Sequence, residues 1–186
     1  MALNLNSGGG DFSPYVKFNA KVGRWFKKEG DVEIEITNPT FIADFANIQT
    51  GWFLYEEGQA PNVVFDDSLS SVSEKPTDKH KRGFKIPLFS EKSFGGYVEF
   101  ASASTNVCNI INSLYVDYEK DAPSNKGKLP VIQCTGNTPQ KGKYGTNYSP
   151  ILSIVKWVDI PQALIDANKT ASPSAVTPKA AANSEF

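Results

Sequence analysis

Basic and aromatic residues lie together in two separate stretches of this sequence, a combination that can bind a polyanion carrying stackable rings. The first stretch, Phe12 to Lys28, contains five basic residues and no acid. The second, Ala122 to Val158, contains five lysines and no acid. Cationic groups contact phosphates and aromatic rings stack on unpaired bases, so this chemistry favours single-stranded nucleic acid.

The acidic residues are concentrated between these stretches. Glu29 to Glu74 contains ten acids and no lysine or arginine, although the formal net charge of the chain is only −1. We therefore expect a cationic surface set apart from an acidic one. The candidate phosphate-binding residues are Lys17, Lys21, Arg24, Lys81, Arg82, Lys85, Lys141 and Lys143. The candidate stacking rings are Tyr15, Trp25 or Phe26, Tyr97, Tyr144 and Tyr148.

Several of these residues have a second interpretation that involves no ligand. Arg24 could pair with Glu35 across a hairpin, and the cluster at Lys81 and Arg82 could be an ordinary solvated face. The segment Lys141 to Tyr148 could be a solvated hairpin loop. The rings of Trp52, Phe53 and Tyr55 are expected in the core, since no basic residue accompanies them.

Alternating apolar residues predict the strands that would position the first cluster. Val16, Phe18, Ala20 and Val22 are expected to face a core, which leaves Tyr15, Lys17 and Lys21 outside. Residues 22–37 are expected to form a hairpin turning near Glu29-Gly30-Asp31, with Val32, Ile34 and Ile36 inward. The length of that turn decides which of Trp25 and Phe26 is exposed, and the sequence is compatible with either.

The remaining elements are expected as follows. Residues 82–89 form a strand that directs Lys85 outward and that Pro87 places at an edge or a bulge. Residues 95–101 form a strand with Tyr97 outward, and residues 104–120 form an amphipathic helix. Residues 129–135 and 151–158 are strands, the second one central. Residues 58–81 and 136–150 are expected to be long loops.

The predicted fold is mainly β with one principal helix. A helix before the last two strands suits a five-stranded Greek-key barrel of the OB type, here with additional strands. We expect a flexible N-terminus over residues 1–12, one binding domain over 13–167 and a disordered tail over 168–186. In that tail, Phe186 with Glu185 is a candidate docking peptide for a protein partner.

Other classes of protein are disfavoured. Familiar catalytic motifs are missing, so we expect neither an enzyme nor a cofactor, although a hydrolase using carboxylates is an alternative. One histidine and two cysteines are too few for a zinc site, and we expect Cys108 and Cys134 to be reduced core residues. We see no signal peptide and no apolar span, which indicates a cytoplasmic protein. A carbohydrate-binding or virion structural β-sandwich is the other alternative.

Three segments together resemble single-stranded DNA-binding proteins of tailed bacteriophages: Lys92-Ser-Phe-Gly-Gly-Tyr-Val-Glu-Phe, the loop of residues 141–150, and the Pro/Ala tail that ends in Phe186. The resemblance implies an OB-fold and sequence-independent binding of single strands during replication and recombination, in the host cytoplasm. It also implies that the tail recruits replication proteins such as a polymerase or a helicase-primase. Such tails are usually acidic, whereas Glu185 is the only acid from Asn168 onward here. A monomer and a homodimer are both compatible with the sequence.

Overall fold

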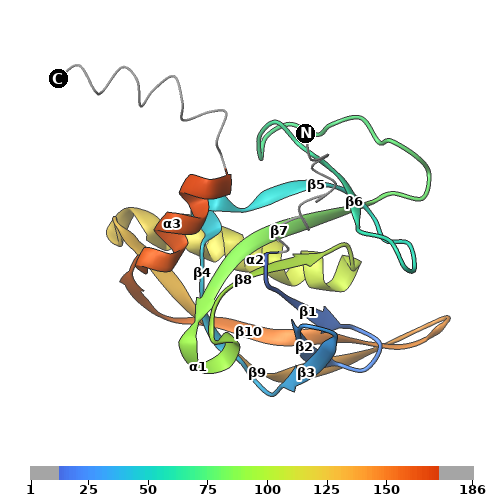
Figure 1. Cartoon of the computed structure of the whole chain (residues 1–186), viewed down its shortest axis with the longest axis horizontal. Helices are drawn as coiled ribbons and strands as arrows, with labels where there is room; N and C mark the ends of the chain where they lie inside the picture. The colour runs from blue at the N-terminus through green and yellow to red at the C-terminus, as the bar shows by residue number, and fades with distance from the viewer. Residues whose placement is uncertain (1–12, 172–186) are drawn as a thin grey trace, which may run out of the picture.

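The computed structural model describes residues 13–171, which form a curled, open sheet with one principal helix (Figure 1). The strands are β1 (Tyr15–Asn19), β2 (Arg24–Glu29), β3 (Val32–Ile36), β4 (Thr40–Ala43), β5 (Gln49–Leu54), β6 (Asn62–Phe65), β7 (Lys81–Ser90), β8 (Gly96–Ser102), β9 (Lys128–Gly142) and β10 (Gly145–Asp159). The helices are α1 (Glu91–Phe94), α2 (Thr105–Asp121) and α3 (Gln162–Ala171), with single 3₁₀ turns at Phe45–Asn47 and Ala122–Ser124.

The strands follow the order β10-β9-β4-β7-β8-β1-β2-β3, and the β5–β6 hairpin branches from β7. All neighbours pair antiparallel except β1 and β8, which run parallel and share only two residue pairs. Among the described strands this leaves β10 and β3 at the two ends of the main path. The mainly β architecture with one main helix therefore agrees with the sequence prediction.

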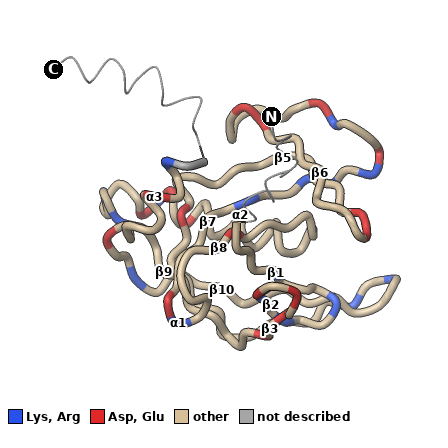
Figure 2. Tube along the Cα trace, viewed as in Figure 1, with Lys and Arg blue, Asp and Glu red and all other residues tan. Residues whose placement is uncertain are grey.

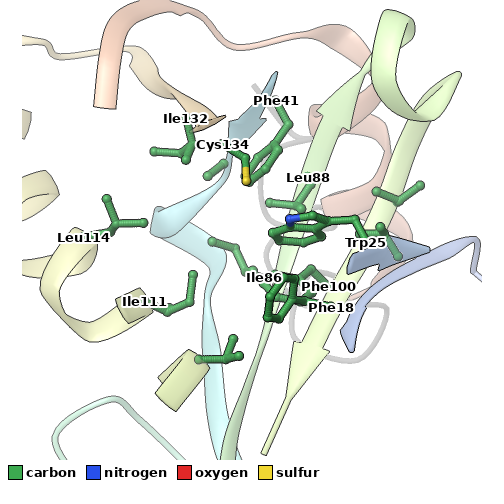
Figure 3. Packing of buried hydrophobic residues seen from close by; sticks show 14 of the residues in the cluster. Phe18, Trp25, Phe41, Ile86, Leu88, Phe100, Ile111, Leu114, Ile132 and Cys134 are labelled. Atoms are coloured by element: carbon green, nitrogen blue, oxygen red, sulfur yellow. The ribbon is translucent and has the colours of Figure 1, made fainter. Parts of the chain in front are cut away.

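The core is formed by residues of the sheet and of helix α2 and is rich in aromatic rings (Figure 3). Trp25 is at its centre, 2% exposed, with ring centroids 5.3 Å from Phe18 and 5.0 Å from Phe100. Helix α2 covers the core with Ile111 and Leu114, which confirms the predicted apolar face of that helix. Ring pairs in such geometries contribute about 0.5–1.5 kcal/mol each beyond the area that they bury.

The β2–β3 hairpin decides which ring of the first cluster is exposed. It turns through Gly30 and Asp31, since Glu29 pairs with Val32, and Trp25 consequently lies opposite Ile36. Trp25 is therefore buried, and Phe26, on the other face, is half-exposed. Val32, Ile34 and Ile36 lie on the same face of the hairpin as Trp25, as predicted. The hairpin extends past the core, however, so only Ile36 packs against it and Val32 is 63% exposed.

Pro87 lies in an interior strand, contrary to the prediction of an edge or a bulge. β7 is flanked by β8 on one side and by β4 and β5 on the other. The carbonyl of Pro87 accepts a hydrogen bond from the backbone N–H of Asp44, just where the chain leaves β4 for β5. The proline nitrogen points to this same side, where no ladder partner needs a donor, so the strand tolerates the missing N–H.

Residues 136–150 are not a loop, because β9 and β10 continue through them as a long hairpin that projects from the body (Figure 1). Lys143 and Tyr144 form its turn, between the paired residues Gly142 and Gly145. Gly145 has a φ of +119°, a conformation that a residue with a side chain adopts only with strain. The sequence did not predict these strands because neither face of this part of the hairpin is buried, so its residues do not alternate between apolar and polar.

Three smaller expectations are also corrected. β10 lies at an edge rather than in the centre, and a bulge at Val155, between Ile154 and Lys156, changes which parity of β10 faces the core. The predicted loop of residues 58–81 contains β6. Helix α3 continues to Ala171, past the expected domain boundary at residue 167, and its Leu164 is fully buried.

Candidate nucleic-acid interface

The convex face of β7, β8, β1 and β2, opposite the core, collects most of the residues expected to contact nucleic acid. Alternation places Val16, Phe18 and Trp25 in the core, so the intervening residues of those strands point to the other face. Register then makes neighbours of Lys17 and Phe26, and of Tyr15 and Glu99. We call this surface the outer face; its predicted members are Tyr15, Lys17, Arg24, Phe26, Lys85 and Tyr97.

Carboxylates share the outer face with these cations, so the expected separation of charges is wrong. Lys17 forms an ion pair with Glu33, and Lys85 lies 3.4 Å from a carboxylate oxygen of Glu99. Arg24 donates to Glu35 at 3.1 Å, which is the pairing that the sequence left open. The cause is topological: the acidic strand β3 folds back directly beside the basic strand β2.

These ion pairs are weak enough to be exchanged for contacts to phosphate. The side chains of Lys17 and Glu33 are 42% and 46% exposed, and those of Arg24 and Glu35 are 59% and 44% exposed. Exposed pairs of this kind contribute about 0–1 kcal/mol. A phosphate that replaces either carboxylate therefore loses little, and the cations remain available to a ligand.

Four aromatic residues accompany the cations on the outer face. Lys17 lies 5.9 Å from the ring centroid of Phe26, and Tyr15 is 38% exposed. Tyr97 donates a hydrogen bond to Glu99, and burial, reinforced by this carboxylate, raises the pKa of its phenol, which stays protonated. Phe65 of β6 was missed, yet it lies 5.4 Å from the Lys85 ammonium. The run Val63-Val64-Phe65 after a proline could have indicated its strand.

Arg82 is not available to phosphate in the way the sequence suggested. Its guanidinium donates two hydrogen bonds to the Asp66 carboxylate, of 2.9 and 2.6 Å. The guanidinium also lies 5.1 Å from the centroid of the Trp52 ring. The Asp66 side chain is only 1% exposed and also accepts from Thr50 and from the Ser73 backbone and hydroxyl. This cluster fastens the segment after β6 to β5 and β7. Lys81 beside it is exposed.

The Asp66 cluster makes stability depend on acid. Hydrogen bonds from Arg82, and further ones from Thr50 and Ser73, hold the pKa of the Asp66 carboxyl well below its ordinary value despite burial. A carboxyl group whose pKa is depressed in the folded state stabilises the fold at pH values above its unfolded pKa of about 4. This stabilisation is lost as the pH falls below that value. We expect the melting temperature to fall between about pH 5 and pH 2, and Asp66→Asn to flatten that fall. An unchanged acid profile in the variant would contradict this assignment.

The outer half of the β9–β10 hairpin, residues 137–150, forms a second cationic surface that we call the ribbon. Every residue from Asn137 to Asn147 is exposed, and Tyr144 at the turn is 95% exposed. The ammonium of Lys143 lies 5.6 Å from the centroid of the Tyr144 ring. Neither Lys141 nor Lys143 forms an ion pair within residues 13–171.

The ribbon and the outer face meet at the turn between β1 and β2. Asn137 donates a hydrogen bond to the carbonyl of Gly23, and the Tyr148 N–H donates to the carbonyl of Ala20, each at 2.7 Å. Gly23 has a φ of +68°, and a Cβ there would lie 2.8 Å from the Asn137 amide, so only glycine fits. The exposed Lys21 lies in this turn, and basic segments gather around it and along the ribbon in Figure 2.

Two predicted stacking residues are therefore structural. Trp25 belongs to the core, as the register of β2 and β3 requires. Tyr148 is half-buried and packs against the core, so it anchors the ribbon rather than presenting a free ring. The candidate partner-binding residues Glu185 and Phe186 lie outside the described residues.

Comparison with known proteins adds no further assignment, since the chain matches no protein-family model, no curated protein and no solved structure. Both cysteines are free thiols. Within the described range, no cluster of His, Cys, Asp and Glu suits a metal ion, and no helix is long and apolar enough to cross a membrane.

Proposed function

We propose that this protein binds single-stranded DNA without sequence preference and protects it during replication and recombination. The observation that carries the proposal is the continuity of the outer face with the ribbon. Exposed and half-exposed rings lie among the lysines of the outer face, and the acid-free ribbon extends that surface beyond the β1–β2 turn. Stacking rings beside backbone-tracking cations are the two elements that sequence-tolerant single-strand binding requires.

The strand order supports a barrel of the OB type as the frame of this surface. Numbered along the chain, β4, β7, β8, β9 and β10 would be strands one to five, and they lie in the order 5-4-1-2-3. The principal helix α2 falls between the third and fourth of them. OB-folds bind oligonucleotides on the face of strands two and three, flanked by the loop between strands four and five. Here those are the outer face at β7 and β8, and the ribbon.

Bases would stack on the rings of the outer face, with the phosphates following the lysines. Phe26, Tyr15 and Tyr97 supply the rings, and each useful stack contributes roughly 1–3 kcal/mol. Lys17 and Lys85 would exchange Glu33 and Glu99 for phosphate oxygens. Because no contact of this kind reads the edge of a base, the affinity would vary little with sequence.

Salt dependence tests the proposal directly. For three or four neutralised phosphates, the affinity for an oligo-dT strand should fall with a log–log slope of roughly −2 to −3, about −0.7 for each phosphate. The double variant Lys141→Ala/Lys143→Ala should make the slope shallower by about 1.4. Fluorescence anisotropy at several salt concentrations measures both.

The matched control is Lys126→Ala/Lys128→Ala, which removes the lysine that begins β9 and another lysine two residues before it. These lysines lie about 45 Å of extended strand from Gly142, so their loss should leave the slope nearly unchanged. A slope near zero in the native protein would refute the proposal. Equal loss of slope in both double variants would refute the role given to the ribbon.

A further inference from the structure

The ribbon has the dimensions of an element that enters a DNA groove. It consists of two paired strands from Asn137 and Pro150 outward to the turn at Lys143 and Tyr144. At about 3.3 Å per residue, it projects roughly 17 Å beyond its attachment at Gly23. The major groove of duplex DNA is about 12 Å wide and 8.5 Å deep, and it admits a two-stranded β-ribbon.

The chemistry of the ribbon differs from that of the outer face. Apart from Tyr144 it exposes no further aromatic ring before Tyr148, so it lacks the succession of stacking platforms that a single strand uses. It presents instead two unpaired lysines together with amide and hydroxyl groups on both sides. Those polar residues are Thr138, Gln140, Thr146 and Asn147. Side chains of these types hydrogen-bond to phosphates and sugars of duplex DNA.

We propose that the ribbon binds duplex DNA where it adjoins the single strand on the outer face. The preferred ligand of this protein is then a junction between single-stranded and double-stranded DNA. The inference rests on the proposed function and adds the duplex part of the ligand. The turn residue Tyr144 lies at the outermost point of the ribbon, where its ring can stack on or wedge against a base step, as inserted side chains do in other DNA-binding proteins.

The test compares three DNAs at one salt concentration: an oligo-dT strand, a blunt hairpin duplex, and that duplex carrying the same oligo-dT strand as an overhang. We expect the junction to bind about tenfold more tightly than the single strand, and the blunt duplex to bind more weakly than either. Equal affinity for the junction and the single strand would overturn the inference and leave the proposed function standing. Failure to bind the single strand would overturn the proposed function itself.

A shortened ribbon locates the effect. Replacing residues 140–147 by Asn-Gly keeps the pairing of Pro139 with Tyr148 and closes the hairpin with a favourable two-residue turn. This variant loses both ribbon lysines, so it should bind the single strand about tenfold more weakly. It should lose about another tenfold for the junction, so that the junction preference disappears. Tyr144→Ala, which leaves the hairpin intact, should lose part of it, whereas Lys126→Ala/Lys128→Ala should keep it. Equal losses for junction and single strand in the shortened variant would leave the roughly tenfold preference intact, show that the ribbon serves the single strand alone, and overturn the inference.

Discussion

Replacing Asp66 by alanine should lower the free energy of unfolding by about 3 kcal/mol, the cost of breaking a buried ion pair from one side. The carboxylate accepts two hydrogen bonds from Arg82 and others from Thr50 and Ser73, and it is shielded from water. The variant leaves the hydrogen-bond donors around this position without their acceptor. Arg82 is 37% exposed and can recover some hydration, which is why the lower end of the usual range applies. Urea denaturation measures the loss.

Asp67→Ala is the matched control, since it removes the same carboxylate from the neighbouring, exposed position. Its effect should stay within about 0.5 kcal/mol, as for ordinary surface substitutions. Similar losses in the two variants would show that general charge balance, rather than the Asp66 cluster, sets the stability of this region.

Substitution of Trp25 should affect mainly the stability of the protein, whereas substitution of Phe26 should affect mainly DNA binding. Trp25→Ala empties the centre of the core and should cost about 3–5 kcal/mol in unfolding free energy. Phe26→Ala removes a half-exposed ring from the outer face and should weaken binding of oligo-dT by about 1–3 kcal/mol. Its effect on stability should be much smaller than that of the tryptophan variant, because its ring is not part of the buried cluster. Thermal unfolding and anisotropy give the two readouts.

Trp25→Phe provides a folded control for the core position. The indole Nε1 of Trp25 has no hydrogen-bond partner among residues 13–171, so the phenyl ring forfeits volume but no hydrogen bond. This variant should retain native affinity for single strands. If it loses affinity as Phe26→Ala does while remaining folded, Trp25 contributes to the interface and the division of roles between the two rings is wrong.

Local patterns in the sequence predicted much of the framework. The alternation in β1, β7 and β8 and the periodicity of α2 each place apolar residues on one side, and burial fixes that side. The choice between Trp25 and Phe26 could not be made in the same way. It depends on whether the turn is centred on Gly30 alone or on Gly30 and Asp31, and a shift of one residue exchanges the two faces of a strand.

The arrangement of charge could be predicted least. Segregation along the chain suggested segregation on the surface, but an antiparallel hairpin places the residues after its turn beside those before it. The acids that follow Glu29 therefore lie against Lys17 and Arg24. The ribbon was not predicted for a related reason, since none of its residues from Thr138 to Asn147 is buried and its two strands pair there through the backbone. The pattern of hydrophobic residues indicates which residues are buried, but it gives no signal for a pair of strands that is exposed to solvent.

The attachment of the ribbon to the β1–β2 turn also sets the order in which the chain can acquire its structure. The hydrogen bond from Asn137 to Gly23 joins residues separated by 114 positions, and that from Asn168 to Asp44 spans 124. Bringing such distant segments together lowers the entropy of the chain before the stabilising contacts form, and this slows folding. On the ribosome, β4 lacks its partner β9, and the β1–β2 turn lacks its contact to the ribbon, until the last hairpin has emerged. The exposed edges of these early strands would meanwhile be open to association with other chains.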